Sequence, residues 1–162
     1  MKYMKYITAV LLLTLLNTTI ASKRNNNQPV QQKFIRDKAM LAETHFNIGN
    51  SFLMLNKYQE AIENFDLAIK YKPNYAKAYV NKGFCLDQLG QHQEAIESYN
   101  LAIKYNPNYG DTYFHKGVCL YLLGQYQEAI ESCNLAIKYD PNNVKAYKLI
   151  NILKQEIADI KK

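Results

Sequence analysis

Three histidines and three cysteines are the side chains of this sequence best suited to nucleophilic or metal chemistry. His115 and Cys119 stand four residues apart, a spacing that places two possible metal ligands on one face of a helix. Two ligands do not make a zinc site, since the protein supplies at least three. The sequence also contains no glycine-rich phosphate-binding turn and no acidic pair singled out for acid–base work. We therefore predict that the protein is not an enzyme and has no catalytic residues, no metal and no cofactor.

The interval between Cys85 and Cys119 is 34 residues, and this interval is the period of a longer internal repeat. The repeated blocks are 42–75, 76–109 and 110–143, and the last two are identical at 22 of 34 positions. A fixed period of this length is typical of stacked helical solenoids. Duplication of a small buried residue then explains the two cysteines. A disulfide between them is not expected, because stacked helices lie about 8–10 Å apart.

Each block contains two amphipathic stretches, which predict two antiparallel helices. In the first block, the apolar positions are Phe46, Ile48, Phe52, Leu55 and then Ala61, Ile62, Phe65, Ala68, Ile69. Small residues such as Gly49, Gly83 and Gly117 recur, which lets the paired helix backbones approach closely. His45 and His92 occupy positions where other blocks have tyrosine, so we predict half-buried structural side chains for both.

Residues with special backbone preferences mark the expected helix ends. Gly90 and Gly124 follow the first helix of their blocks, and Asn56 holds the same place in the first block. A left-handed residue at this place ends a helix. Each second helix is expected to end before a Pro-Asn pair, because proline cannot continue it. The asparagines of these pairs, which are Asn74, Asn108 and Asn142, are expected to cap the following helices.

One set of residues recurs through the blocks with a recognisable pattern. In the second block the set is Gly83, Leu86, Ala95, Tyr99, Ala102 and Pro107. It resembles the signature of the tetratricopeptide repeat. The resemblance implies an all-α fold, a right-handed α-solenoid of antiparallel helix pairs, with residues 144–162 as a C-terminal capping helix. His45, Tyr79 and Tyr113 depart from the family, which often has tryptophan there, and Cys133 replaces an aromatic residue.

In the tetratricopeptide repeat family, the first helices of successive repeats line a concave groove that binds peptides. The resemblance and the helix spacing together assign a peptide-binding groove to this chain. Its residues are Phe46, Asn50, Leu53, Val80, Asn81, Phe84, Phe114, His115, Val118 and Tyr121, with Ile152 extending it. Exposed apolar patches usually mark a partner site. The alternative for each apolar residue is simple packing between repeats.

A well-known variant of the family binds the terminal carboxylate of chaperone tails with lysine, arginine and asparagine side chains. Asn50 and Asn81 match its asparagines. Phe46, Asp111 and His115 stand where its cationic residues should be. A carboxylate would be poorly compensated beside these residues, so we predict an apolar or mixed segment as the ligand.

The first 21 residues have the layout of a secretory signal peptide, with Lys2 and Lys5 before the apolar run 7–16. We predict cleavage after Ala21 and therefore an exported protein, periplasmic or secreted, with no membrane span after cleavage. An uncleaved inner-membrane anchor is the alternative, although the run is short of the roughly 20 residues that span a bilayer. Residues 22–41 are expected to form a polar leader, flexible at 23–29, and a lead-in helix.

The formal net charge of +6 is modest, and charges of both signs are interspersed, so no nucleic-acid partner is expected. The predicted function is a non-catalytic protein–protein interaction scaffold that binds a peptide or helix of an envelope partner. One alternative is a homo-oligomeric structural module of the cell envelope, in which the groove receives a neighbour's helix or its 28–40 leader. A second is a metal- or thiol-dependent enzyme that uses His115 and Cys119.

Overall fold

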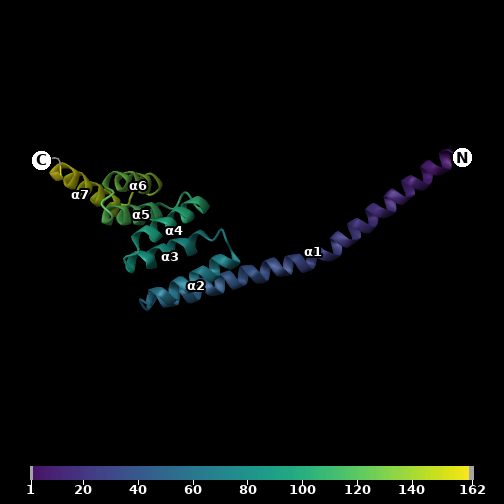
Figure 1. The fold of residues 1–162 in the computed structure, drawn as a ribbon, viewed down its shortest axis with the longest axis horizontal. Helices are drawn as coiled ribbons and strands as arrows, with labels where there is room; N and C mark the ends of the chain where they lie inside the picture. Colours follow the sequence, from purple (N-terminus) through teal and green to yellow (C-terminus); the bar gives the residue numbers. More distant parts are fainter. Residues whose placement is uncertain (1, 161–162) are drawn as a thin grey trace. The chain divides into compact units, whose positions relative to one another are not determined.

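The computed structural model describes residues 2–160, with side chains described for residues 16, 17 and 30–160. Within this range every regular element is a helix (Figure 1). The helices are α1 (Lys2–Met54), α2 (Tyr58–Tyr71), α3 (Ala76–Gln88), α4 (His92–Tyr105), α5 (Gly110–Leu122), α6 (Tyr126–Tyr139) and α7 (Val144–Ile160). The chain forms two compact units, one that ends at Met40 and one that begins at Leu41.

Helix α1 is continuous through residues 23–29, where we expected a flexible leader. Asparagine, glutamine and lysine each cost less than about 1 kcal/mol in a helix, so these polar residues do not exclude one, whereas Pro29 disfavours it by about 3 kcal/mol. Within the predicted signal peptide, 1–21, the structure describes side chains only for residues 16 and 17. The cleavage of this segment stays a prediction. None of the described helices combines the length and apolar character that a bilayer crossing requires.

From Leu41 onward, the chain is a series of stacked helix pairs. Within the repeats α3 contacts α4 and α5 contacts α6, whereas α2 to α3, α4 to α5 and α6 to α7 are the contacts between repeats. The first helices also contact each other along the series, α3 with α5 and α5 with α7. Each helix therefore packs mainly on its neighbours in sequence, as expected for a solenoid.

A close contact between a glycine and a buried side chain sets the spacing of each helix pair. A Cβ atom added at Gly49 would lie 2.7 Å from Phe65 Cε1, and one added at Gly83 would lie 2.7 Å from Tyr99 Cε1. In the third repeat, Gly117 faces the Sγ atom of Cys133. Phe65, Tyr99 and Cys133 are fully buried. The predicted role of the small residues in close helix approach is confirmed.

The turn inside each repeat has the same left-handed geometry three times. The φ angles are +57° at Asn56, +76° at Gly90 and +74° at Gly124. In each turn, the next residue donates its backbone N–H to a carbonyl five residues earlier. These bonds run from Lys57 to Phe52 at 3.0 Å, from Gln91 to Leu86 at 2.9 Å and from Gln125 to Leu120 at 2.9 Å. This pattern closes the helix ends and confirms the predicted turn residues.

The predicted helix caps were wrong by one position. Tyr75 and Tyr109, which follow Asn74 and Asn108, are the N-cap residues of α3 and α5, and neither side chain caps its helix. Before α7 the N-cap side chain is that of Asn143, whose Oδ1 accepts the backbone N–H of Ala146 at 3.0 Å. The Pro-Asn pairs lie one residue too early because the chain completes its turn through them before the helix begins.

Stacked aromatic rings occupy the positions where the family often has tryptophan. Ring centroids lie 5.7 Å apart for His45 and Tyr71, 5.7 Å for Tyr79 and Tyr105, and 5.3 Å for Tyr113 and Tyr139. Each pair joins the first helix of a repeat to the end of its second helix. The departures from the family pattern therefore keep an aromatic contact, and His45 is half-buried as predicted.

The glycine contact predicts a measurable cost for adding one methyl group. Gly83→Ala improves helix propensity by about 1 kcal/mol, yet its Cβ would overlap the ring of Tyr99. We expect a net loss of about 1–3 kcal/mol in the free energy of unfolding, the usual cost of overpacking. Urea denaturation measures it, with Gln88→Ala on the exposed side of the same helix as control. Equal or higher stability of Gly83→Ala would contradict a tight contact.

Candidate functional site

The residues predicted for the groove lie on the first helices, and the structure divides them into two groups. Val80 is 9% exposed and belongs to the main hydrophobic core. The other nine are partly exposed. We call these nine the first-helix face, which consists of Phe46, Asn50, Leu53, Asn81, Phe84, Phe114, His115, Val118 and Tyr121.

A direct hydrogen bond joins the two asparagines of the first-helix face. Asn81 Nδ2 donates to Asn50 Oδ1 at 2.7 Å, across the boundary between α1 and α3. This bond uses only part of the donor and acceptor capacity of each side-chain amide, and both residues are partly exposed. Each amide can therefore form further hydrogen bonds with a ligand. The structure therefore brings these two asparagines together.

An aromatic cluster surrounds His115 in the centre of the face. The imidazole centroid lies 5.5 Å from the ring of Phe114 and 6.0 Å from the rings of Phe84 and Tyr99. Burial lowers the pKa of His115 below its ordinary value of 6.5. Asp111 and Asp87 raise this pKa and Lys145 lowers it, but burial is the largest effect. The imidazole is therefore neutral near pH 7.

Several apolar members of the face also serve packing. The ring of Phe46 lies 5.9 Å from Phe65 and 4.9 Å from Tyr75, and Leu53, Val118 and Tyr121 pack against the main core. Part of each of these side chains is therefore used in packing, within the first repeat for Phe46, while the rest is exposed. Their packing restricts the rotamers of these side chains while part of each remains accessible to solvent.

The electrostatics differ from those needed to hold a terminal carboxylate. Phe46 brings no charge, and Asp111 is an exposed carboxylate that accepts a hydrogen bond from Asn143 Nδ2 at 3.4 Å. His115, the third position, is the neutral imidazole described above. The three positions together carry no cation that could compensate an anionic ligand.

A polar cluster that sequence reasoning missed lies between the second and third repeats. We call it the Asp87 cluster, and it consists of Asp87, His92 and Cys119. His92 is half-buried as predicted, but its Nδ1 lies 2.8 Å from Asp87 Oδ1. Within the described residues, no group of three metal ligands includes His115, the histidine that we had considered beside Cys119. The available signal was Asp87 itself, which departs from Leu53 and Tyr121 at the equivalent positions.

The three cysteine thiols are buried and free. Burial raises the pKa of Cys85 and of Cys133 to about 11. Burial also raises the pKa of Cys119, and the adjacent Asp87 carboxylate raises it further. All three thiols are therefore protonated near neutral pH, which makes them poor nucleophiles.

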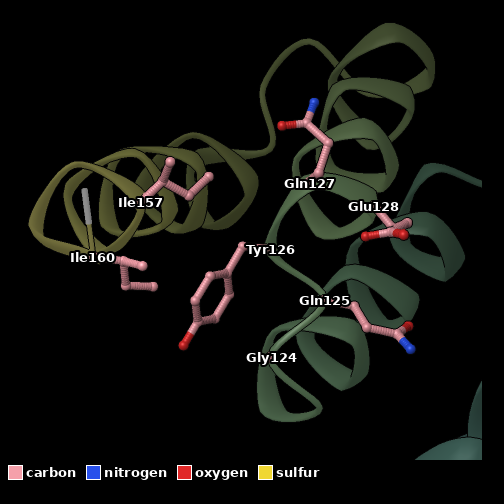
Figure 2. A pocket seen from close by; sticks show the side chains of 7 residues that line it. All are labelled: Gly124, Gln125, Tyr126, Gln127, Glu128, Ile157 and Ile160. Carbon is pink, nitrogen blue, oxygen red and sulfur yellow. The ribbon is translucent and has the colours of Figure 1, made fainter.

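A pocket of about 600 Å³ lies away from the first-helix face, between α6 and α7. Figure 2 shows Ile157 and Ile160 of α7 on the side that faces Tyr126 of α6. The remaining lining comes from the turn at Gly124 and the first residues of α6. Ile152, the predicted extension of the groove, is exposed on α7 and is not among the residues that line this pocket.

Comparison with known proteins identifies the repeat. The family model described as tetratricopeptide repeat matches residues 42–75, 76–109 and 110–143, the blocks defined by the sequence period. No curated protein sequence matches the chain significantly.

Solved structures of tetratricopeptide repeat (TPR) domains share the fold. The first TPR of Spaghetti (RPAP3), bound to the HSP90 peptide SRMEEVD, has a TM-score of 0.72 and 23% identity, over 74% of this chain and 95% of that chain. The TPR2B domain of yeast Sti1 in complex with pHsp70 has a TM-score of 0.69 and 25% identity, over 72% and 98%. MamA has a TM-score of 0.71 and 22% identity, over 82% and 83%. The predicted right-handed α-solenoid is confirmed.

The neutral imidazole of His115 predicts a pH dependence of stability. Because its pKa is lowered in the folded state, the unfolded chain binds this proton more readily. The free energy of unfolding should therefore fall as the pH falls below about 6.5. His115→Asn introduces the residue found in the other two repeats and removes this contribution. We expect a change from about pH 7 to about pH 5 to lower the free energy of unfolding of the wild type more than that of the variant. Urea denaturation at each pH measures this free energy. Parallel pH profiles would contradict the effect.

Proposed function

Because the chain belongs to the tetratricopeptide repeat family, we propose that it is a protein-interaction scaffold whose first-helix face binds a peptide or helix of a partner. The proposal rests chiefly on one observation, the row of partly exposed apolar and aromatic side chains along α1, α3 and α5. Monomers rarely leave large contiguous apolar patches exposed without a partner. Related TPR domains are recorded in complex with HSP90 and HSP70 peptides, which agrees with this type of function.

The chemistry of the face supports a particular class of ligand. Phe84 and Phe114 flank a neutral His115, so the centre of the face offers apolar surface and ring edges. The Asn50–Asn81 pair beside it provides amide groups that suit the backbone of a bound segment. We propose an apolar or mixed peptide or helix as the ligand, in contrast to an acidic chain terminus, which would require cations.

The cellular setting of this proposal comes from the N-terminal sequence. The basic start, the apolar run 7–16 and the small residue Ala21 fit a cleaved export signal. We propose that the scaffold works in the cell envelope or outside the cell, on an envelope partner. Mass spectrometry of the protein from the extracytoplasmic fraction tests this, since a first residue other than Ser22 would contradict cleavage after Ala21.

A second candidate is self-association. Val30, Phe34 and Ile35 are exposed apolar residues within the 28–40 segment that we considered as the occupant of a neighbour's face. In that case, the mass from light scattering should rise with protein concentration, and deletion of residues 28–40 should abolish the rise. A concentration-independent monomer mass would exclude this candidate.

The first-helix face predicts loss of partner capture in a charged variant. Phe84→Glu/Phe114→Glu places two carboxylates beside His115 and should weaken binding of an apolar segment by roughly 30-fold, which corresponds to about 2 kcal/mol. A crosslinking pull-down from envelope extracts measures this, with circular dichroism to verify the fold. Leu101→Glu/Leu135→Glu is the matched control, because these exposed leucines lie on the second helices.

Capture by the wild type and the control, but not by the Phe84/Phe114 variant, is the expected result. Equal capture by all three proteins would reject the first-helix face as the binding surface. The peptide SRMEEVD, which the Spaghetti TPR binds, serves as a ligand control. We expect no saturable binding of this acidic peptide to the wild type, and saturable binding that Asn81→Ala weakens would contradict the proposed ligand class.

A further inference from the structure

Possible metal ligands from three helices meet in the Asp87 cluster. Asp87 lies near the end of α3, His92 begins α4 and Cys119 lies within α5. The donor atoms of the three side chains all lie within 4.8 Å of one another. Asp87 Oδ1 is 2.8 Å from His92 Nδ1 and accepts a hydrogen bond from Cys119 Sγ at 3.3 Å. The carboxylate therefore holds the other two ligands close together.

The neighbouring repeats show that the fold does not require these polar groups. The equivalent positions are Leu53, Tyr58 and Cys85 at the preceding boundary and Tyr121, Tyr126 and Leu153 at the following one. Only at the boundary of the second and third repeats do a carboxylate and an imidazole replace apolar and aromatic side chains. The side chain of Asp87 is only 12% exposed, and a buried carboxylate is costly without strong partners. Packing alone therefore gives no reason for this arrangement.

The boundary of the second and third repeats also contains the buried side chain of Tyr99, whose ring stacks on His115 at a centroid distance of 6.0 Å. Tyr99 is fully buried, and its hydroxyl has no hydrogen-bond partner within the described part of the chain. Phe65 and Cys133, at the equivalent positions, carry no hydroxyl. Buried hydroxyls normally have a partner, so this boundary has a further polar group that packing does not explain.

We propose that Asp87, His92 and Cys119 bind a zinc ion. Imidazole nitrogen, carboxylate oxygen and thiolate sulfur are all zinc ligands, and three protein ligands leave a fourth tetrahedral position for water. Calcium and magnesium are disfavoured because they take oxygen ligands and not sulfur. None of the three ligands is among the nine residues of the first-helix face, although Asp87 is equivalent to Leu53 and Tyr121 of that face. The proposal does not depend on the proposed function.

Zinc binding requires only small movements of the three side chains. A tetrahedral zinc ion with bonds of about 2.0–2.3 Å holds its ligand atoms about 3.3–3.8 Å apart, so a pair at the 4.8 Å limit closes by about 1 Å. The distance between Asp87 Oδ1 and His92 Nδ1 must increase from 2.8 Å for both atoms to bind zinc. The His92 side chain is 24% exposed, which leaves room for the imidazole to rotate. The thiol proton of Cys119 passes to solvent as the zinc–sulfur bond forms.

The test uses the full chain purified without an affinity tag and treated with a chelator. Zinc affinity is measured by competition with a chromophoric chelator, and cobalt replaces zinc as a spectroscopic probe. We expect one zinc ion per chain, tetrahedral cobalt bands and a sulfur-to-cobalt charge-transfer band. Asp87→Leu/His92→Tyr introduces the residues of the first repeat and should weaken zinc binding by roughly 100-fold or more, since two of three ligands are lost.

Further variants identify the sulfur ligand. Cys119→Ala should remove the charge-transfer band, whereas Cys85→Ala and Cys133→Ala should keep it. Circular dichroism verifies that each variant is folded. The proposal is overturned if the wild type binds no zinc, or if the Asp87/His92 variant binds zinc and cobalt as the wild type does. It is also overturned if the charge-transfer band persists in Cys119→Ala.

Discussion

The contact between a glycine of each first helix and a buried side chain of each second helix is the constraint on which the rest of the structure depends. Gly49, Gly83 and Gly117 bring the two helix axes close enough for Phe65, Tyr99 and Cys133 to fill the space between them. With the spacing fixed, the left-handed turns at Asn56, Gly90 and Gly124 reverse the chain at constant register. Because every repeat has the same geometry, equivalent positions face equivalent surroundings. The first-helix face and the Asp87 cluster are both defined by this regularity.

Periodicity made most of the repeat architecture predictable. The glycine positions, the turn residues and the helix pairs follow from spacing alone, since each depends on contacts within one block. The helix caps were misplaced because the Pro-Asn turn uses one more residue than the pattern reveals. Val80 was predicted to lie on the ligand surface but belongs to the core. Helix spacing predicts the direction of a side chain but not how deeply it is buried. The flexible leader was expected from composition, which does not exclude a helix.

The Asp87 cluster could not be predicted by the same reasoning, because it crosses from one repeat to the next. Asp87 and Cys119 are 32 residues apart in sequence. Their contact depends on how α3 and α5 lie against each other, which a single block does not encode. A comparison of equivalent positions, Asp87 against Leu53 and Tyr121, would have drawn attention to the site. In a repeat protein, departures from the internal consensus are therefore as informative as the consensus itself.

The polar boundary between the second and third repeats also affects how the array opens. In a linear array, the stability is approximately the sum of the intrinsic stabilities of the repeats and the couplings between nearest neighbours, and the weakest coupling decides where the array divides. Apolar contact contributes most of such a coupling, and the Asp87 cluster replaces part of it with a carboxylate and an imidazole. Backbone amides on either side of this boundary should therefore exchange with solvent through separate opening events. The tandem array would then behave as two cooperative units, although its helices form one continuous stack.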